Sequence, residues 1–256
     1  MKNSEQHFEF EGKTYTKVYD PQGKSYHFLR NGNPIDVYEW NEVANRYHPM
    51  SHKATHPTPV VRWIEKHRWF LTRRHVTTNG SKFILDIGCE SGNIASPMAS
   101  DRYHLILMDV DRKMLSSIRS NAKNVLMTCL TGDIYTVPFK DGAIDRIICT
   151  EVLEHLTDPE KAIREIGRIL KPGGRVVISV PNDRLILWIK QKLIQAGLKK
   201  VLGNLSPGLA IGHLRIFNRK SLSTLFGGEL KIIRCFYNFP WFTNIFLVAE
   251  KKGKTS

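Results

Sequence analysis

Residues 131–182 read TGDIYTVPFKDGAIDRIICTEVLEHLTDPEKAIREIGRILKPGGRVVISVPN, and this stretch decides the fold class. Residues 144–150 form a short apolar run rich in β-branched side chains, which predicts a strand buried on both faces of a parallel sheet. Residues 159–170 have helical periodicity behind a first-turn proline, and residues 174–180 predict a second buried strand. This order predicts a parallel pair of strands with a helical crossover.

The same alternation extends in both directions from this stretch. Upstream, we expect strands at 82–87, 104–109 and 124–129, separated by helices at 92–99 and 111–121. Downstream, a helix near 218–226 precedes strands at 230–237 and 244–250, which are close enough in the chain to pair as an antiparallel hairpin. The sequence therefore predicts an α/β fold whose mostly parallel sheet ends in an antiparallel C-terminal edge.

The N-terminal part of the chain has a different pattern. Residues 8–40 alternate hydrophobic and polar side chains around the turn sequences DPQG at 20–23 and NG at 31–32, which predicts a small β-rich extension. Residues 59–74 predict a helix that packs on the main domain through one face. We expect that face to consist of Val60, Trp63, Ile64, His67 and Leu71. The histidines at 48, 52 and 56 recur every four residues, but the prolines at 49, 57 and 59 favour a polar loop there.

The composition favours a basic protein that is not embedded in a membrane. The 256 residues include 38 Lys and Arg against 24 Asp and Glu, a net charge of +14, which suits nucleic acid, phospholipid headgroups or a phosphorylated substrate, but also an ordinary basic enzyme. No apolar run approaches the roughly 20 residues of a membrane span. The N-terminus lacks the pattern of a secretory signal, so we expect a cytoplasmic protein with four reduced, widely spaced cysteines.

Several short motifs follow one another in a fixed order. The segment FILDIGCESG at 83–92 is a strand that ends in an acidic residue and a glycine-bearing turn. Then come MDVD at 108–111, GD at 132–133, VPF at 137–139, EVLEH at 151–155 and LKPGG at 170–174. Together these motifs resemble the S-adenosylmethionine-dependent methyltransferases of the seven-stranded Rossmann-like class, which include the methyltransferase type 11 proteins and the ubiquinone-biosynthesis O-methyltransferases. The resemblance covers residues 80–182, with a weaker fit over 213–250.

The resemblance implies how the chain is organised and where the cofactor binds. Residues 1–57 would form the β-rich extension, and residues 58–256 the methyltransferase domain with a helical insert at 183–213. Asp86 and Gly88 would line the methionine end of S-adenosylmethionine, Asp109 would hold the ribose hydroxyls, and Asp133 with Ile134 would lie against the adenine. These roles are chemically reasonable because a carboxylate can accept hydrogen bonds from ribose hydroxyls and from an exocyclic amine.

The glycine-bearing turn departs from the family pattern D-x-G-x-G-x-G. Glu90 occupies the position of the middle glycine, between Gly88 and Gly92, and so brings a carboxylate to the cofactor site. That carboxylate would repel the carboxylate of the cofactor unless it turns outward or contacts the ammonium or sulfonium. Pro97 lies inside the expected helix that follows. Both departures raise the alternative of a catalytically degenerate methyltransferase fold that serves as a binding subunit.

The EVLEH segment is the candidate acceptor site. If the chain turns into a helix there, the spacing of Glu151, Glu154 and His155 puts the three side chains on one face at the carboxyl edge of the sheet. These groups could simply solubilise the turn. In the ubiquinone-biosynthesis and small-RNA 2′-O-methyltransferases, such a segment and a downstream histidine, here His213, bind a divalent ion. The four side chains would then prepare an acceptor hydroxyl, and without a metal His155 or His213 could act as the general base.

The sequence is compatible with several kinds of methyl acceptor. Residues 183–205 predict an amphipathic helix with Leu185, Trp188, Ile189 and Leu193 opposite Lys190, Lys192, Lys199 and Lys200. Such a helix is typical of a lid over the substrate pocket and also of peripheral contact with an anionic membrane. We expect methylation of an oxygen, with a nitrogen as the alternative, of a small or lipid-linked acceptor. RNA 2′-O-methylation ranks second, because the charge favours it but no RNA-recognition module is evident.

Overall fold

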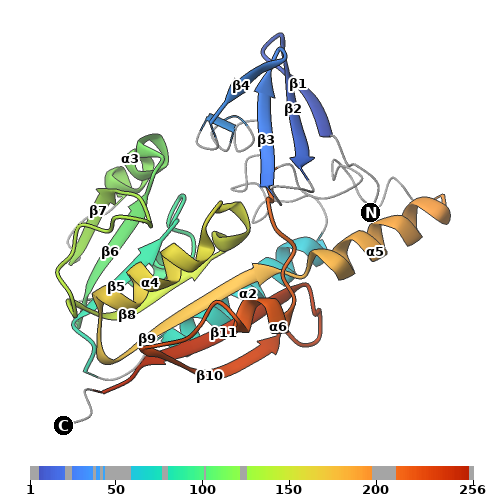
Figure 1. Cartoon of the computed structure of the whole chain (residues 1–256). Helices are drawn as coiled ribbons and strands as arrows, with labels where there is room; N and C mark the ends of the chain where they lie inside the picture. Colours follow the sequence, from blue (N-terminus) through green and yellow to red (C-terminus); the bar gives the residue numbers. More distant parts are fainter. Residues whose placement is uncertain are drawn as a thin grey trace.

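The computed structural model describes residues 6–20, 25–36, 39–40, 43, 59–76, 80–100, 102–121, 126–197 and 212–253, and structural statements here concern those residues. A seven-stranded sheet dominates, in the order β10-β11-β9-β8-β5-β6-β7 (Figure 1). Its strands are β5 (Phe83–Ile87), β6 (His104–Asp109), β7 (Met127–Thr131), β8 (Ile144–Thr150), β9 (Leu170–Pro181), β10 (Leu230–Tyr237) and β11 (Asn244–Lys251). Strands β5 to β9 pair in parallel, whereas β11 is antiparallel to β9 and β10. The predicted fold class is confirmed.

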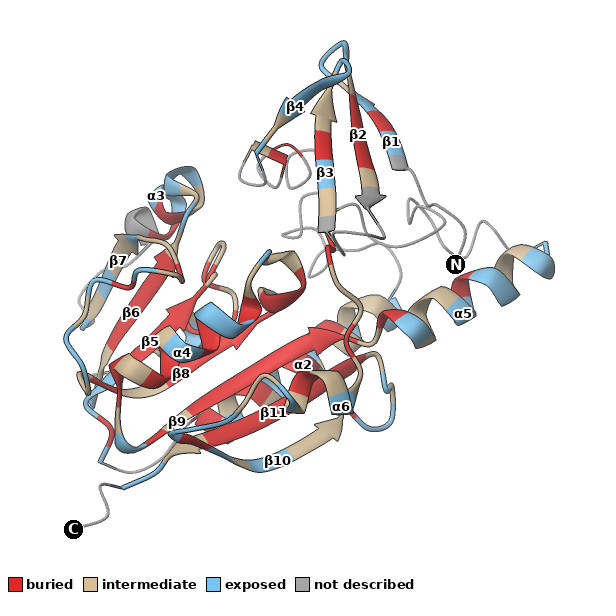
Figure 2. Ribbon diagram, in the orientation of Figure 1, coloured by how far each residue is buried: buried red, intermediate tan, exposed pale blue. Residues whose placement is uncertain are grey.

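The central strands of this sheet, β5, β6, β8, β9 and β11, are largely buried, whereas the edge strands β7 and β10 are more exposed, as Figure 2 shows. In β8, Ile147 and Cys149 belong to one hydrophobic cluster while Ile148, between them, belongs to the other. Helices α4 (Pro159–Ile169) and α6 (Arg219–Ser223) contribute side chains to the first cluster. Helices α2 (Pro59–Val76) and α3 (Arg112–Asn121) contribute to the second. Apolar residues on both sides of the central strands explain why these segments lack the polar alternation of a half-exposed strand.

Two helix predictions are wrong in detail. Instead of a helix over 92–99, the chain forms only a 3₁₀ turn, η2 (Ser96–Met98), because Pro97 supplies no N–H and is confined to the start of a helical turn. The expected packing face of α2 is also wrong. Val60 and Trp63 are 52% and 57% exposed, whereas the polar side chains of Glu65, Arg68 and Thr72 are buried. Helix α2 covers a polar site through Glu65 and Arg68, and packs on the apolar core through Trp69, Leu71 and Val76.

The N-terminal residues form a separate antiparallel sheet, so the predicted β-rich extension is confirmed (Figure 1). Its strands are β1 (Gln6–Phe10), β2 (Lys13–Asp20), β3 (Ser25–Arg30) and β4 (Asn33–Ile35), in that order. Leu214, from the C-terminal half of the chain, packs into its core with Phe8, Tyr15, Phe28, Trp40 and Val43. Most of the DPQG turn and the histidines at 48, 52 and 56 lie outside the described residues.

Helix α5 (Asp183–Gln195) confirms a helix after β9 and extends outward from the end of that strand (Figure 1). Asp183 and Lys190 are buried, whereas Trp188 is 57% exposed, so part of the apolar face points to solvent and a basic residue points inward. The helix ends at Gln195 before a turn at Ala196 and Gly197, so the predicted helix over 183–205 is too long, and its part from residue 198 on, including Lys199 and Lys200, lies outside the described residues. Among the helices that the structure describes, none combines the length and hydropathy needed to cross a bilayer.

Candidate cofactor and acceptor sites

A cavity lies at the point where the strand order of the large sheet reverses. Strand β5 is flanked by β6 on one side and by β8 on the other, and crevices at such switch points bind ligands in open α/β sheets. Helix α2 packs against β8 and β9, and its residues Glu65, Arg68 and Trp69 line the cavity. The lining residues are Glu65, Arg68, Trp69, Asp86, Gly88, Cys89, Glu90, Asn93, Ile94, Thr150 and Glu151. Three of the predicted cofactor residues, Asp86, Gly88 and Glu90, are therefore brought together here.

Two glycines shape the turn after β5 in ways that other residues could not. Gly88 has φ of 70°, and a Cβ there would lie 2.4 Å from Cγ2 of Val152. Gly92 has φ of 73°, and its Cβ would lie 2.4 Å from Oγ of Ser96. Left-handed backbone and close approach both require glycine, so the chain keeps a tight turn whose backbone faces the cavity.

Asp109 fixes this turn from the end of β6. Its Oδ2 accepts a 2.8 Å hydrogen bond from the backbone N–H of Glu90, and its Oδ1 accepts a 2.9 Å bond from the N–H of Asp111. Glu90 itself has φ of 48°, an unfavourable value for a residue with a Cβ. Burial raises the pKa of Asp109 above its usual range. A carboxylate has about four lone-pair sites, so Asp109 retains capacity to accept ribose hydroxyls.

Asp86 has the chemistry of a ligand-binding group. Its side chain is 1% exposed, and neither carboxylate oxygen has a hydrogen-bond partner among the described residues. Burial, with added repulsion from Asp109 and Glu90, raises its pKa well above the usual range. A buried polar group without partners is costly, so such a group inside a cavity fits a ligand that donates hydrogen bonds or carries positive charge. The turn and Asp86 together fit S-adenosylmethionine.

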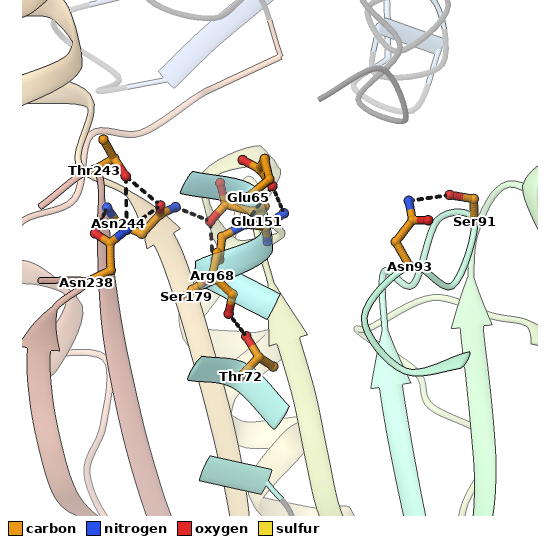
Figure 3. A network of polar contacts seen from close by, with 10 residues as sticks. All are labelled: Glu65, Arg68, Thr72, Ser91, Asn93, Glu151, Ser179, Asn238, Thr243 and Asn244. Carbon is orange, nitrogen blue, oxygen red and sulfur yellow. Dashed lines mark hydrogen bonds and ion pairs between the residues drawn. The ribbon is translucent and has the colours of Figure 1, made fainter. Parts of the chain in front are cut away.

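Helix α2 adds an ion pair that sequence reasoning missed. Glu65 and Arg68 are both buried and line the cavity, with Oε2 and Nη2 2.6 Å apart (Figure 3). Thr72, one turn further along, donates its hydroxyl to the carbonyl of Arg68. The i, i+3 and i+7 spacing of these residues is a helical stripe of polar side chains that was present in the sequence. The prediction overlooked this stripe because another face of the same helix is more apolar and periodicity favours that one as the packing face.

The adenine-side residues lie at the end of β7. Asp133 follows the strand, and its Oδ1 accepts a 2.8 Å hydrogen bond from the N–H of Tyr135. The side chain of Ile134 is buried in the hydrophobic cluster below. Neither residue lines the cavity beside α2, and Gly92 shapes the turn without lining it. Their predicted contacts with the cofactor stay predictions.

Three of the four predicted acceptor-site residues come together. Glu154, His155 and His213 place one ligand atom each within 4.8 Å of one another, an arrangement that could hold a metal ion. Glu154 is fully buried, and the two imidazole rings meet edge to face with centroids 5.1 Å apart. Glu154 and His155 belong to a single 3₁₀ turn, η3 (Leu153–His155), which begins three residues after the last residue of β8, Thr150. This turn places the group at the carboxyl edge of the sheet, next to the cofactor cavity.

Glu151 does not join this group. Its Oε1 accepts hydrogen bonds from Oγ of Ser179 at 3.1 Å and from Nδ2 of Asn244 at 3.0 Å, and its side chain lines the cofactor cavity instead (Figure 3). The expectation of one helical face for positions 151, 154 and 155 is wrong. The helical turn starts only after Glu151, which has φ of 58°, so the i, i+3 relation of a continuous helix does not apply.

The sheet order, the glycine turn at its switch point and the acidic strand ends define a Rossmann-like methyltransferase. The family model described as a methyltransferase domain matches residues 85–178. The chain is 31% identical over 180 residues to a ubiquinone biosynthesis O-methyltransferase of Chromobacterium violaceum, a match that covers 68% of this chain and 74% of that protein. The chain therefore belongs to the S-adenosylmethionine-dependent methyltransferase family.

Other similarities cover a smaller part of a relative or concern the fold. An uncharacterised 37.1 kDa protein in transposon TN4556 of Streptomyces fradiae is 35% identical over 102 residues, which cover 38% of this chain but only 30% of that protein. A chain in the complex between the Haloferax volcanii Trm112 methyltransferase activator and a methyltransferase superposes with a TM-score of 0.63 at 15% identity, covering 86% of this chain and all of that one. An S-adenosylmethionine-dependent methyltransferase from Methanosarcina mazei superposes with a TM-score of 0.53 at 18% identity, covering 72% and 98%. At these identities the superpositions show the fold alone.

Proposed function

We propose that the protein transfers a methyl group from S-adenosylmethionine to an oxygen of a small or lipid-linked acceptor. The observation that carries this proposal is the convergence of Glu154, His155 and His213 at the sheet edge. Thr150 and Glu151, immediately before that turn, line the cofactor cavity, so the two sites are adjacent along the chain. The similarity to a ubiquinone biosynthesis O-methyltransferase supports oxygen as the acceptor atom and a lipid-linked acceptor.

The cavity residues divide between the charged groups of the cofactor. Arg68 would pair with the methionine carboxylate, and the carboxyl group of Asp86 would take the ammonium. Gly88 lets the backbone approach the ligand, while Asp109 would accept the ribose hydroxyls and Asp133 with Ile134 would contact the adenine. When bound, S-adenosylmethionine supplies a methyl group on a positively charged sulfur. The residues themselves hold the ligand in place and exclude water from it.

The cluster of Glu154, His155 and His213, called the acceptor group below, offers ligand atoms that suit a divalent ion. One carboxylate and two imidazoles are ligands typical of Mn²⁺, Fe²⁺ or Zn²⁺. A bound ion would lower the pKa of an acceptor hydroxyl. Nδ1 of His155 donates to the carbonyl of Gly212, which leaves Nε2 as the nitrogen that can act as ligand or base. In the absence of metal, His155 or His213 would take the hydroxyl proton directly.

The surroundings of the acceptor group support contact with lipid. Trp188 on α5 is 57% exposed and Ile189 is 37% exposed, and Arg184 and Lys192 on the same helix are also exposed. Exposed aromatic and basic side chains on one helix favour the surface of an anionic membrane. We propose that residues 183–205 make this peripheral contact. We also propose the division into an extension at 1–57 and a methyltransferase domain at 58–256 with its insert at 183–213, which the separate sheet and core of β1 to β4 support.

Calorimetry and a methylation assay test the proposal. Titration with S-adenosylhomocysteine should show binding, and labelled S-adenosylmethionine should transfer its methyl group to a simple phenol or to a phenolic lipid in anionic vesicles. A chelator should stop the transfer, and added Mn²⁺ should restore it. Lack of S-adenosylhomocysteine binding at millimolar concentration would exclude the enzyme and favour a binding subunit. Methylation of a short RNA in place of both phenols would move the acceptor to nucleic acid.

A further inference from the structure

The segment that carries His213 is held along the η3 turn by its backbone. The N–H of Leu214 donates to the carbonyl of Glu154 at 2.7 Å, and Nδ1 of His155 donates to the carbonyl of Gly212 at 2.9 Å. Residues 212–214 therefore lie beside the other two members of the acceptor group. These contacts place the backbone at position 213, but they leave the orientation of the imidazole ring to other residues.

Asp183 orients that ring. Its Oδ2 lies 3.0 Å from Nδ1 of His213, and both side chains are buried, at 3% and 6% exposed. An ionised carboxylate only accepts hydrogen bonds, so the proton of the neutral imidazole is held on Nδ1. The lone pair is then on Nε2, the atom available to a metal ion or to an acceptor proton. Carboxylates hold metal-binding histidines in the same way, and removing them typically lowers metal affinity about 10- to 100-fold.

Lys17 connects the same histidine to the N-terminal sheet. It lies on β2, is 1% exposed, and donates from Nζ to the carbonyl oxygen of His213 at 2.8 Å. Burial lowers the pKa of the Lys17 amino group to about 7, and the nearby Asp183 carboxylate partly opposes this lowering. The next residue along the chain, Leu214, is inserted into the hydrophobic core of that sheet. Lys17 binds the carbonyl of His213, and Leu214 packs into the N-terminal sheet. Together they hold the segment from the side opposite η3.

We propose that Asp183 and Lys17 are positioning residues for His213, and that the N-terminal sheet is thereby an integral part of the acceptor site. Asp183 sets the tautomer of the imidazole, and Lys17 fixes the backbone that carries it. This inference rests on the proposed function of Glu154, His155 and His213. On this proposal the β-rich extension helps to position a residue of the acceptor site. If the extension only bound substrate, changes in it would leave the position of His213 unaffected.

Nuclear magnetic resonance of ¹⁵N-labelled histidine side chains tests the role of Asp183 in the full chain. His213 should show the tautomer with the proton on Nδ1, and Asp183→Asn should shift it toward the Nε2-protonated form, because the new amide can donate to Nδ1. His213→Asn identifies the signals. An unchanged tautomer in Asp183→Asn would overturn the role of Asp183, whether or not the protein binds metal or cofactor.

Hydrogen exchange tests the role of Lys17. Lys17→Met should accelerate exchange of the Leu214 amide at least about tenfold. In the wild type, local opening of this segment must also break the hydrogen bond from Lys17 to the carbonyl of His213, and in the variant that cost is absent. Lys13→Met, the same substitution at an exposed position of β2, is the matched control and should have no effect. Mn²⁺ affinity should fall about tenfold in Lys17→Met and Asp183→Asn but not in Lys13→Met. Equal exchange in the two lysine variants, with circular dichroism showing both folded, would overturn the proposal. If the wild-type protein does not bind Mn²⁺, the proposed metal site is contradicted. The exchange and tautomer measurements would still decide whether Lys17 and Asp183 position His213.

Discussion

Glu65 and Arg68 form a buried ion pair, 2.6 Å from Oε2 to Nη2, on the face of α2 that covers the cavity lined by Asp86. The pair balances its own charge, while Asp86 has no hydrogen-bond partner among the described residues. A ligand that carries both a carboxylate and an ammonium, as the methionine part of S-adenosylmethionine does, is complementary to this arrangement. We therefore predict that the covering helix supplies part of the binding site as well as packing.

Replacement of Arg68 tests that role. Arg68→Met should weaken S-adenosylhomocysteine binding at least about tenfold by calorimetry, since a charge-assisted hydrogen bond contributes about 1.5–3 kcal/mol. It should also destabilise the protein, because Glu65 would remain buried without its partner. The double variant Glu65→Leu, Arg68→Met should recover stability without recovering affinity. Arg74→Met, at an exposed position of the same helix, is the control and should bind normally. Normal affinity in the double variant would show that Arg68 is structural only.

Asp86→Asn should raise stability and weaken binding at once. The raised pKa means that the folded protein retains a proton that the unfolded chain loses above about pH 4, so stability falls as pH rises through that range. Asparagine removes this penalty, and the free energy of unfolding at pH 7 should increase by about 1–2 kcal/mol. The gain should vanish near pH 3, where both states of the wild type are protonated. Thermal denaturation at the two pH values, with calorimetry for the ligand, checks the prediction, and an equal gain at both would refute the titration of Asp86.

Glu90→Gly should strengthen cofactor binding. The substitution removes a carboxylate from the cavity and relieves a left-handed backbone conformation, which costs a non-glycine residue about 1–2 kcal/mol. Both S-adenosylhomocysteine affinity and the melting temperature should rise. Glu90→Gln separates charge from conformation, because it should improve affinity without relieving the backbone. Weaker binding in both variants would instead indicate that the carboxylate contacts the positive groups of the cofactor.

Gly88→Ala should be markedly more destabilising than Gly80→Ala. Both glycines have positive φ, at 70° and 83°, but only at Gly88 would a Cβ meet another side chain, 2.4 Å from Val152. Gly80→Ala should therefore cost about 1–2 kcal/mol for the backbone alone, and Gly88→Ala about 1–3 kcal/mol more for the overlap. Urea denaturation measures the difference. Equal costs would show that Val152 moves aside freely.

Glu154→Gln should strongly weaken divalent-ion binding, whereas Glu151→Gln should not. Only Glu154 belongs to the group that could hold a metal, and the Glu151 carboxylate is bonded to Ser179 and Asn244. Mn²⁺ affinity measured by calorimetry should fall on the order of 100-fold in the first variant and stay within about threefold of the wild type in the second. Equal losses would return Glu151 to the metal site.

The sequence predicted the strands of the large sheet well and the helices less well. Strands β6, β8 and β10 begin and end at the predicted residues, because each contains a run of apolar side chains bounded by polar or turn-forming residues. The face of α2 was mispredicted because Glu65 and Arg68 are buried, contrary to the usual tendency of charged residues. Of the four residues predicted for the acceptor site, Glu154, His155 and His213 lie together and Glu151 does not. Glu151 differs because a positive φ separates it from the turn that follows.

The sequence by itself determined the fold, the glycine turn and the acidic strand ends, because hydrophobic periodicity and glycine positions are local properties that short segments express. Only the tertiary structure decided which polar groups meet. Lys17, Asp183 and His213 come from positions up to 196 residues apart, and Arg68 reaches the cavity from a helix whose polar stripe has no local signature of function. Such contacts arise from the packing of distant elements, and burial of their charges makes them strong enough to matter.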